Sequence, residues 1–317
     1  MKRMQWLDGH CDVLSKMWQN LPEHRFYDSK SKLDSSYHRL RKAPVALQVF
    51  AIWVPETVSR AQRLSVALKQ ADLFYEQIIQ QGEQVHLVDS KGQLKKCFQN
   101  RTGAILAMEG ADALQGELEN LRLFFRLGVR QLGLTWNYAN EAADGIEESR
   151  DGGLTLFGKK LIAEMARLGI ILDVSHLSER GFWEVMESDL PILASHSNCR
   201  KIAPHKRNLE DGQIRAIIDK QGLIGITFVP SFVWQPSQAV SVKHILLHIE
   251  HVCSLGGEKH LFFGSDFDGI DNKIKDLPNY QYIYRLKNAL LQHYPESLVR
   301  KWAWENGYAF YLKHLPL

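Results

Sequence analysis

Residues 153–178 read GLTLFGKKLIAEMARLGIILDVSHLS. Apolar residues recur at helical spacing over 155–169, and Gly169 is a residue type that often ends a helix. The run 169–176 is then almost wholly apolar and closes on His176. A helix that leads straight into a buried-type strand is the repeating unit of parallel α/β folds. We therefore expect this stretch to be one unit of a larger alternating fold.

Seven further apolar runs along the chain have the composition of strands. Several are almost continuously apolar, as parallel strands covered on both faces are. Polar residues or glycines close each run. The eight expected strands are 4–10, 45–53, 103–109, 129–136, 169–176, 190–196, 223–230 and 260–266.

Helical segments separate most of these runs. This alternation predicts an α/β fold, a (β/α)8 TIM-type barrel with additional C-terminal helices and an active site at the carboxyl ends of its strands. A doubly wound open sheet is the alternative, but no strand is followed by a dinucleotide or P-loop motif. No linker or internal repeat interrupts 1–317, so one hydrolase barrel domain is expected. The expected helices are 59–82, 155–169, 178–188, 209–222, 241–257, 279–292 and 295–313.

The composition limits the class of partner. The 317 residues are 45% hydrophobic, which allows a large core, and 39 Lys and Arg nearly balance 36 Asp and Glu. Since no basic run stands out, neither nucleic acid nor a membrane surface is an expected partner, and a small molecule is. We find no signal-peptide pattern and no apolar stretch of about 20 residues, so a cytoplasmic protein is expected. The four cysteines lack a C-x-x-C pair, which argues against disulfides and thiolate zinc sites.

Residues able to bind a metal stand at the ends of five predicted strands. Alone, each could be a turn residue or a helix cap. Together, on one face of a barrel, they would be costly to bury unless a divalent metal satisfied several of them at once. These three imidazoles and three carboxylates are His10, Asp12, Glu109, His176, His196 and Asp266.

The first of these strand ends, in WLDGHCDVLSKMW, combines His10 with Asp12. Residues two apart on an extended strand point to the same face, so both side chains can reach one ion. Cys11 should then face the other way and take no part.

A second histidine cluster lies in KHILLHIEH. His244, His248 and His251 have the i, i+4, i+7 spacing of one helical face, which can bind a metal. They belong to a crossover helix, however, and no catalytic carboxylate is grouped with them. A solvated histidine-rich stripe is the expectation here.

The chain resembles the membrane dipeptidase (renal dipeptidase) family of zinc peptidases over nearly its full length, and it looks like a bacterial member of that family. The resemblance implies two Zn²⁺ per chain, with His10 and Asp12 on one, His176 and His196 on the other, and Glu109 bridging them. The motifs that carry it, in family order, are DGHCD, AMEGAD, LGLTWN, GLTLFGKKLIAEMARLGIILDVSHLS, ILASHSNCRKIAPHKRNLED and LFFGSDFDG.

The resemblance also implies roles in catalysis. Asp266 is expected to handle the proton and Arg207 to grip the free carboxylate of a dipeptide, for which its planar fork is suited. Two zinc ions can share a bridging water and make hydroxide available at neutral pH. Asp173 and Asp268 are candidate partners for the ligand histidines.

One position departs from the animal enzymes of the family, which carry a histidine after LT. This chain has Trp136 there, as many bacterial relatives do, so the stabilisation of the oxyanion is open. Asn137 or Asn140 is a candidate substitute, and we place Trp136 and Asn140 among the expected substrate-binding residues.

The expected function is a binuclear zinc dipeptidase, with substrates carrying a C-terminal D-residue and assembly into a homodimer both left open. A dizinc barrel hydrolase of another amide, lactone or phosphoester is the first alternative. A non-catalytic metal-binding barrel is the second.

Overall fold

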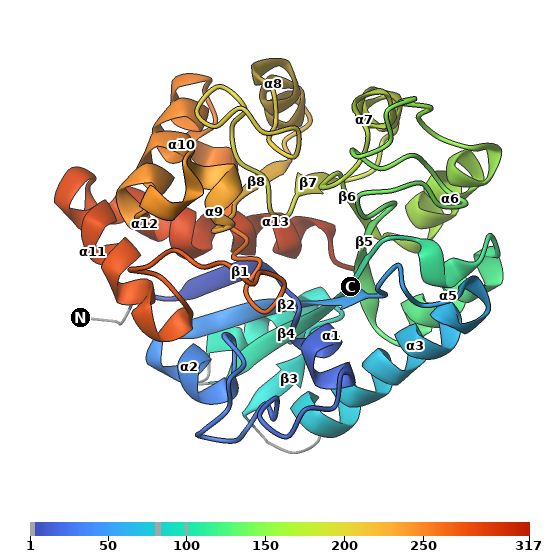
Figure 1. Ribbon diagram of the computed structural model, residues 1–317, viewed down its shortest axis with the longest axis horizontal. Coiled ribbons are helices and arrows are strands. Elements are labelled where there is room, and N and C mark those ends of the chain that lie inside the picture. Colours follow the sequence, from blue (N-terminus) through green and yellow to red (C-terminus); the bar gives the residue numbers. More distant parts are fainter. Residues whose placement is uncertain (1–3, 80–83, 99–100) are drawn as a thin grey trace.

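The computed structural model describes residues 4–79, 84–98 and 101–317, and an all-parallel sheet forms its centre (Figure 1). Helices surround this sheet on its outer side. The strands are β1 (Trp6–Cys11), β2 (Val45–Trp53), β3 (Val85–Leu87), β4 (Thr102–Glu109), β5 (Val129–Gly133), β6 (Ile171–Asp173), β7 (Ile192–Ala194), β8 (Leu223–Ile226) and β9 (Leu261–Phe263).

The sheet closes into a barrel. Strand β1 pairs with both β2 and β9, and β2 pairs with β4, so the ring runs β1-β2-β4-β5-β6-β7-β8-β9. The predicted (β/α)8 barrel is therefore confirmed. Strand β3 pairs with the first residues of β4 and stands outside the ring. The sequence does not predict β3, because three residues carry too little pattern to mark a strand.

The strands on the β5 to β9 side end earlier than predicted. For example, β6 ends at Asp173 rather than at His176, and β9 ends at Phe263 rather than at Asp266. The apolar run continues past the last ladder hydrogen bond, which makes the strand look longer in the sequence. The consequence is that several site residues stand on irregular segments just beyond the barrel.

The helices follow the predicted alternation, with short ones added. Helix α6, in the stretch quoted first, begins where Thr155 Oγ1 accepts a hydrogen bond from Gly158 N and ends at Gly169, whose φ is +74°. The α-helices are α1 (Val13–Trp18), α2 (Tyr37–Lys42), α3 (Arg60–Leu73), α4 (Lys91–Leu94), α5 (Leu118–Arg126), α6 (Leu156–Leu168), α7 (Glu179–Met186), α8 (Asp211–Asp219), α9 (Pro230–Val233), α10 (Val242–Ser254), α11 (Ile283–His293), α12 (Glu296–Arg300) and α13 (Asn306–His314).

Two predicted helices are divided in the structure. Helix α3 continues as a π-helical segment, η1 (Phe74–Ile79), and the end of the predicted helix 59–82 lies outside the described residues. The predicted helix 295–313 consists of α12, the π-helical segment η7 (Lys301–Glu305) and α13. The additional C-terminal helices are thus present.

The core has two apolar layers, separated by the strands. Alternate residues of the strands form an inner cluster, which includes Leu7, Ile105 and Phe262, while the others pack outward against the helices. Helix α13 belongs to the inner cluster, and Tyr311 Oη donates a hydrogen bond to Gln131 Oε1 inside the barrel. This helix therefore covers the barrel end away from the site. Among the described residues, no helix is both long and apolar enough to cross a membrane.

Candidate metal centre and active site

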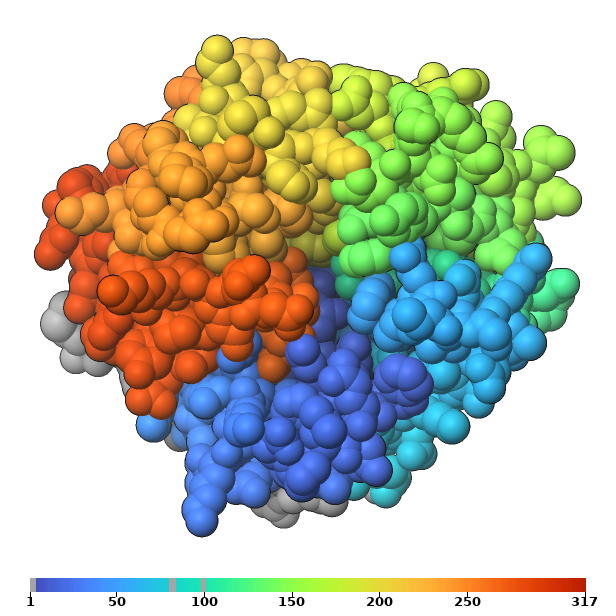
Figure 2. Space-filling model, in the orientation of Figure 1, coloured from blue at the N-terminus to red at the C-terminus, as the bar shows by residue number. Residues whose placement is uncertain are grey.

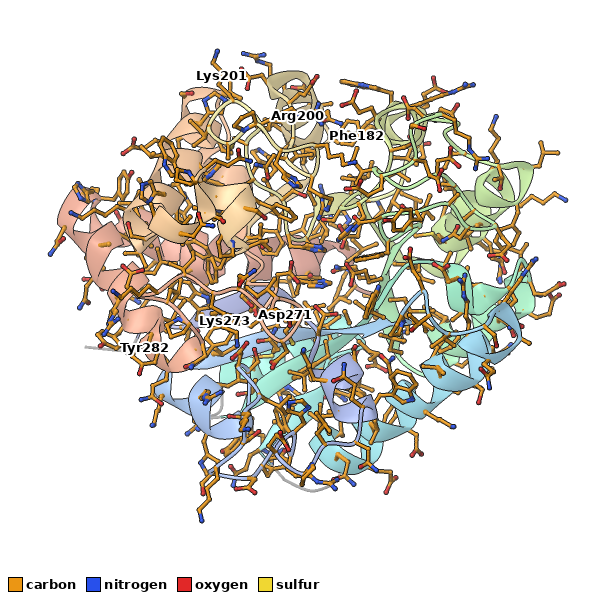
Figure 3. All side chains as sticks on the ribbon, in the orientation of Figure 1. Phe182, Arg200, Lys201, Asp271, Lys273 and Tyr282 are labelled. Carbon is orange, nitrogen blue, oxygen red and sulfur yellow. The ribbon has the colours of Figure 1, made fainter. Side chains whose placement is uncertain are left out.

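A cavity of about 380 Å³ opens at the carboxyl ends of the strands. Its walls come from α1 and from the segments that end or follow β2, β4, β5, β6, β8 and β9. The surface is hollowed near its centre, where the blue N-terminal segment meets green and orange-red ones (Figure 2). Asp271, a lining residue, is labelled near the middle of the same view (Figure 3). The site is thus where barrel enzymes carry theirs.

A β-bulge in β1 aims His10 into the barrel. Asp8 pairs with Gln48 and Cys11 with Phe50, so three steps along β1 match two along β2. The extra residue reverses the alternation. Leu7 belongs to the inner cluster, but after the bulge Cys11 packs in the outer layer and His10 faces inward.

Asp8 anchors this bulge to the segment that follows the last strand of the ring. Its two carboxylate oxygens accept hydrogen bonds from Ser265 N and Ser265 Oγ, each at 2.7 Å. Asp266 N in turn donates to His10 O at 3.2 Å. We had not singled out Asp8, although a carboxylate inside an otherwise apolar strand was a signal for it.

Glu109 lies between the histidines. It continues the inward alternation of β4, and its Oε1 lies 2.9 Å from His176 Nε2 and 3.4 Å from His196 Nε2. Its other oxygen, Oε2, lies 3.5 Å from His10 Nε2. The two oxygens of one carboxylate therefore face two different groups of residues.

Hydrogen bonds at Nδ1 orient the two later histidines. His176 Nδ1 lies 2.7 Å from Asn137 Oδ1, and His196 Nδ1 lies 2.6 Å from Ser195 Oγ. An amide oxygen only accepts, so His176 carries its proton on Nδ1 and turns the lone pair of Nε2 towards the centre. The two Nε2 atoms lie 2.8 Å apart.

Backbone strain accompanies two of these residues. His176 has φ +68° and Asp266 has φ +61°, both in the left-handed region that side chains other than glycine rarely adopt. Gly269 lies close by, where a Cβ would stand 2.3 Å from Asp12 Oδ2 and 2.6 Å from Asp266 Oδ1. This segment therefore needs a glycine to approach the two carboxylates.

The donor set fits divalent metal ions. His10 Nε2 is buried without a hydrogen-bond partner among the described residues, although it lies 3.3 Å from Asp12 Oδ2 and 4.0 Å from Asp266 Oδ1. Within each of three residue groups, one ligand atom per residue lies within 4.8 Å of the others. The groups are His10 with Asp12 and Asp266, Glu109 with His176 and His196, and His10 with Asp173 and His196.

At three of these residues the protonation states agree with that fit. At His10 they do not, because Glu109 and Asp12 raise its pKa and favour a charged imidazolium, from which a metal would have to displace the proton. Burial lowers the pKa of His176 to about 4 and holds the pKa of His196 well below its usual value, so both imidazoles are neutral. Burial alone would raise the pKa of Glu109, but His10 and the other two imidazoles hold it well below its usual range. Neutral imidazole and ionised carboxylate are the forms that bind metal.

The sequence pattern of the membrane dipeptidase family (peptidase family M19) matches residues 1–308. The chain belongs to this family. A metallo peptidase from Rhodobacter sphaeroides, liganded with a phosphinate mimic of the dipeptide L-Ala-D-Ala, matches with a TM-score of 0.92 at 28% identity, over 98% of this chain and 99% of that one. The dipeptidase AC of family M19 matches with a TM-score of 0.92 at 29% identity over the same shares. Dipeptidase aclJ of Aspergillus oryzae is 29% identical over 87% of this chain and 70% of its own length.

These similarities confirm the predicted family and its chemistry at the level of the reaction. The chain is a metal-dependent dipeptidase, an enzyme that hydrolyses peptide bonds. The role of each site residue in this M19 dipeptidase depends on where the structure places its side chain.

Arg207 lies beside the centre and is almost fully buried. Its Nη2 donates to His196 O at 3.2 Å, and the guanidinium stands 5.5 Å from the ring centre of Phe232, which lines the cavity. Its Nε has no hydrogen-bond partner among the described residues. Burial lowers the pKa of Arg207 to about 10, so it stays charged at neutral pH.

The other two predicted substrate contacts differ in placement. Trp136 lines the cavity, with its ring centre 5.3 Å from that of Trp53 and 6.0 Å from that of His176. Asn140 does not line it, and its role in binding substrate stays a prediction. The Asn140 amide holds its own loop together. Its Nδ2 donates to Asp112 Oδ2 and Leu134 O, and its Oδ1 accepts from Ala142 N and Ala143 N.

The two acidic residues expected behind the histidines accept hydrogen bonds from other groups, although a carboxylate oxygen of Asp173 lies within 4.8 Å of a ring nitrogen of both His10 and His196. Asp173 Oδ1 accepts hydrogen bonds from Ser175 N and Ser195 N, both at 3.0 Å. Asp268 accepts from the backbone N–H groups of Asp34 and Ser35. Asn137 and Ser195, both neutral, orient His176 and His196 instead. The sequence pattern does not mark either of them for this role.

The histidines of α10 are not a solvated stripe, and that expectation was wrong. His248 is fully buried, with Cys199 N donating to its Nδ1 at 3.1 Å and its Nε2 2.8 Å from Val233 O. His244 Nδ1 accepts from Ser241 N at the helix start, and His251 Nε2 lies 2.6 Å from Asp211 Oδ1. Each therefore stabilises the packing of α10.

Proposed function

We propose that this dipeptidase works with two zinc ions. His10 and Asp12 would bind one of them. His176 and His196 would bind the other, and Glu109 would bridge the pair. The observation that carries the proposal is the placement of Glu109, whose Oε1 faces His176 and His196 while its Oε2 faces His10.

Zinc in this position would lower the pKa of a water molecule towards neutrality and polarise the substrate carbonyl. Asp266 lines the cavity at the edge of the centre, with Oδ1 4.0 Å from His10 Nε2. From there its carboxylate would accept the proton of the attacking water and pass it to the leaving amine. Trp53 and Trp136 stand on the cavity wall and would keep bulk water from the reacting groups.

Arg207 would hold the free carboxylate of the dipeptide. A buried guanidinium with an unpartnered Nε has a hydrogen bond left to give, and a planar fork matches a carboxylate. This contact would limit the substrate to two residues, since a longer chain would bring another bond over the centre. We include dipeptides with a C-terminal D-residue, because the Rhodobacter sphaeroides relative was solved with a mimic of L-Ala-D-Ala.

Metal analysis of the zinc-loaded protein, combined with a panel of L,L- and L,D-dipeptides, tests this function. We expect two zinc ions per chain at full activity, and loss of hydrolysis when a chelator removes them. Full activity with one zinc per chain would contradict the bridged arrangement. Asp266→Asn should lower kcat by about 10²–10⁴ with the zinc content retained. Undiminished turnover would refute its proton role.

Arg207→Met separates a dipeptidase from a hydrolase of another amide, lactone or phosphoester. Dipeptides should lose about 10² in kcat/KM, because their buried carboxylate loses its partner, whereas dipeptide amides without that carboxylate should lose far less. Equal losses on both substrates would favour the alternative hydrolase.

A further inference from the structure

A second cavity lies beside the first and shares Trp136 with it. Its volume is about 270 Å³. Its walls include Glu56 after β2, Asp112 after β4, and Trp136 and Tyr138 after β5. We call this cavity the side pocket. Apart from Trp136, none of these residues takes part in the proposed chemistry.

The side pocket lies across the barrel mouth from Arg207. In the ring of eight strands, Arg207 follows β7, while β2 is four strands away in either direction, β4 is three and β5 is two. Figure 1 has β7 in the upper part of the ring and β2 and β4 in the lower part. The segment that leads to Arg207 begins at the top of the view, where Arg200 and Lys201 are labelled (Figure 3). A dipeptide with its carboxylate at Arg207 therefore extends its N-terminal residue towards the side pocket.

Negative charge prevails in the side pocket. Glu56 and Asp112 line it, and Glu148 lies near enough to add to the field at Glu56. Arg63 is the one cation among its described lining residues, and its Nη1 already donates to Asp112 Oδ1 at 2.6 Å. Glu56 forms no ion pair with any described residue. One carboxylate thus stays available to a ligand.

Aromatic faces accompany this carboxylate. The ring centres of Trp136 and Tyr138 are 6.1 Å apart, and Tyr138 is 49% exposed. The face of an aromatic ring attracts cations, and tryptophan does so most strongly. A long side chain can lay its methylene groups along a ring and carry its charge beyond it.

We infer that the side pocket receives the side chain of the substrate's N-terminal residue and selects a cationic one, lysine or arginine. Trp136 would carry the methylene stem, with Tyr138 and Glu56 around the charge. The inference rests on the proposed function, since the carboxylate contact at Arg207 sets the direction of the dipeptide. It also gives Trp136 a role in specificity.

Hydrolysis of lysyl-alanine and norleucyl-alanine by the zinc-loaded enzyme tests the inference. The two N-terminal side chains have the same unbranched four-carbon length, but only lysine carries the ammonium group. We expect kcat/KM to be about five- to tenfold higher for lysyl-alanine at low salt, because one carboxylate and two rings act on the charge. High salt should reduce this ratio. A ratio near one would overturn the inference.

Substitution of Glu56 locates the preference. In Glu56→Gln the ratio of lysyl-alanine to norleucyl-alanine should fall close to one. Glu305→Gln is the matched control, since Glu305 is an exposed carboxylate on η7 in the C-terminal helical region, and its ratio should stay at the wild-type value. An unchanged ratio in Glu56→Gln would exclude the side pocket as the source.

Two further measurements separate the failure of the inference from that of the proposed function. The first compares alanyl-lysine with alanyl-norleucine. If the enzyme prefers lysine in this pair and not in the pair lysyl-alanine and norleucyl-alanine, the pocket for the cation receives the C-terminal residue, and the inference is wrong. The second is the activity of Arg207→Met. If kcat/KM falls equally for dipeptides and for their amides, the proposed carboxylate contact is wrong. The direction assigned to the substrate is then wrong as well, whatever the ratio of lysyl-alanine to norleucyl-alanine.

Discussion

The metal centre and helix α10 each carry three histidines, and they differ in what the ring nitrogens face. In the centre, His176 Nε2 and His196 Nε2 lie 2.8 Å apart, and His10 Nε2 has no hydrogen-bond partner in the described part of the chain. Along α10, every histidine has a partner of its own, in a backbone group, a carboxylate or the helix start.

The spacing of histidines along the chain would have favoured the wrong set. The α10 histidines follow one another at helical intervals, whereas the centre draws its histidines from positions far apart in the sequence. The two sets differ in their surroundings. In the metal centre, ring nitrogens of several histidines meet beside the Glu109 carboxylate, whereas on α10 each histidine has a hydrogen-bond partner of its own. Four substitutions can sharpen or break this comparison.

Glu109→Gln should have the largest effect. The amide keeps the shape of the side chain but removes the charge between the imidazoles, so zinc binding should weaken and kcat/KM should fall by about 10³ or more. Zinc content and dipeptide turnover measure this. Asp211→Asn is the matched control at α10, where a carboxylate also contacts a histidine, and it should leave both quantities unchanged. Equal zinc loss in both variants would break the comparison.

His248 should control stability rather than metal binding. Burial lowers its pKa to about 4, against about 6.5 in an unfolded chain. The depressed value means that the unfolded chain takes up a proton first as the pH falls. Protonation of His248 therefore does not affect stability above pH 6.5. Between pH 6.5 and pH 4 it lowers the free energy of unfolding by about 3 kcal/mol.

Urea unfolding across this pH range, in wild type and His248→Gln, measures that effect. The variant should be less stable by about 2 kcal/mol near neutral pH, because Cys199 N loses its acceptor, and its stability should depend less on pH. Its zinc content should equal that of the wild type. A lowered zinc content with unchanged stability would reverse the roles assigned to the two histidine sets.

Asn137→Ala should act on metal affinity. Without the acceptor at Nδ1, His176 is free to turn and to change its tautomer, which should weaken zinc binding by about 10- to 100-fold. Competition with a chromogenic chelator measures the affinity, and histidine ¹⁵N shifts of the metal-free protein report the tautomer. Asn120→Ala, which removes a hydrogen bond to Leu114 O outside the cavity lining, is the control and should change neither.

His251→Gln should have the smallest effect. The partner of His251, Asp211, has a side chain 38% exposed, and exposed ion pairs contribute little. The free energy of unfolding should change by no more than about 0.5 kcal/mol, with the zinc content retained. A larger loss would mean that the surface end of α10 is as important to stability as its buried middle.

Much of the fold followed from local pattern. Apolar runs that alternate with amphipathic helices can bury both faces of a sheet in few ways. The barrel could therefore be predicted from the sequence, although the ends of its strands could not. Those ends were placed too late on the β5 to β9 side, because an apolar residue looks the same whether it lies in the ladder or just beyond it. Strand β3 is too short to show any period.

The candidate site was predictable as a set of residue types. Glu109 follows the inward alternation of β4, whereas Asp266 and the histidines stand at the carboxyl ends of other strands or just beyond them. The orienting residues were not predictable, since asparagine and serine beside a histidine are common on any loop. Asn137 and Ser195 acquire their role only when their side chains lie within hydrogen-bond reach of a ring.

The sequence by itself determined the alternating units, the barrel they form and the residue types at its mouth, because these depend on hydrophobic pattern and chain order. Only the tertiary structure decided which lone pairs meet. The bulge between Asp8 and Cys11 turns His10 inward, and a left-handed backbone turns His176 towards Glu109. Both depend on hydrogen bonds between segments far apart in the chain. Convergence to within a few ångströms is a property of the assembled barrel, not of any one of its strands.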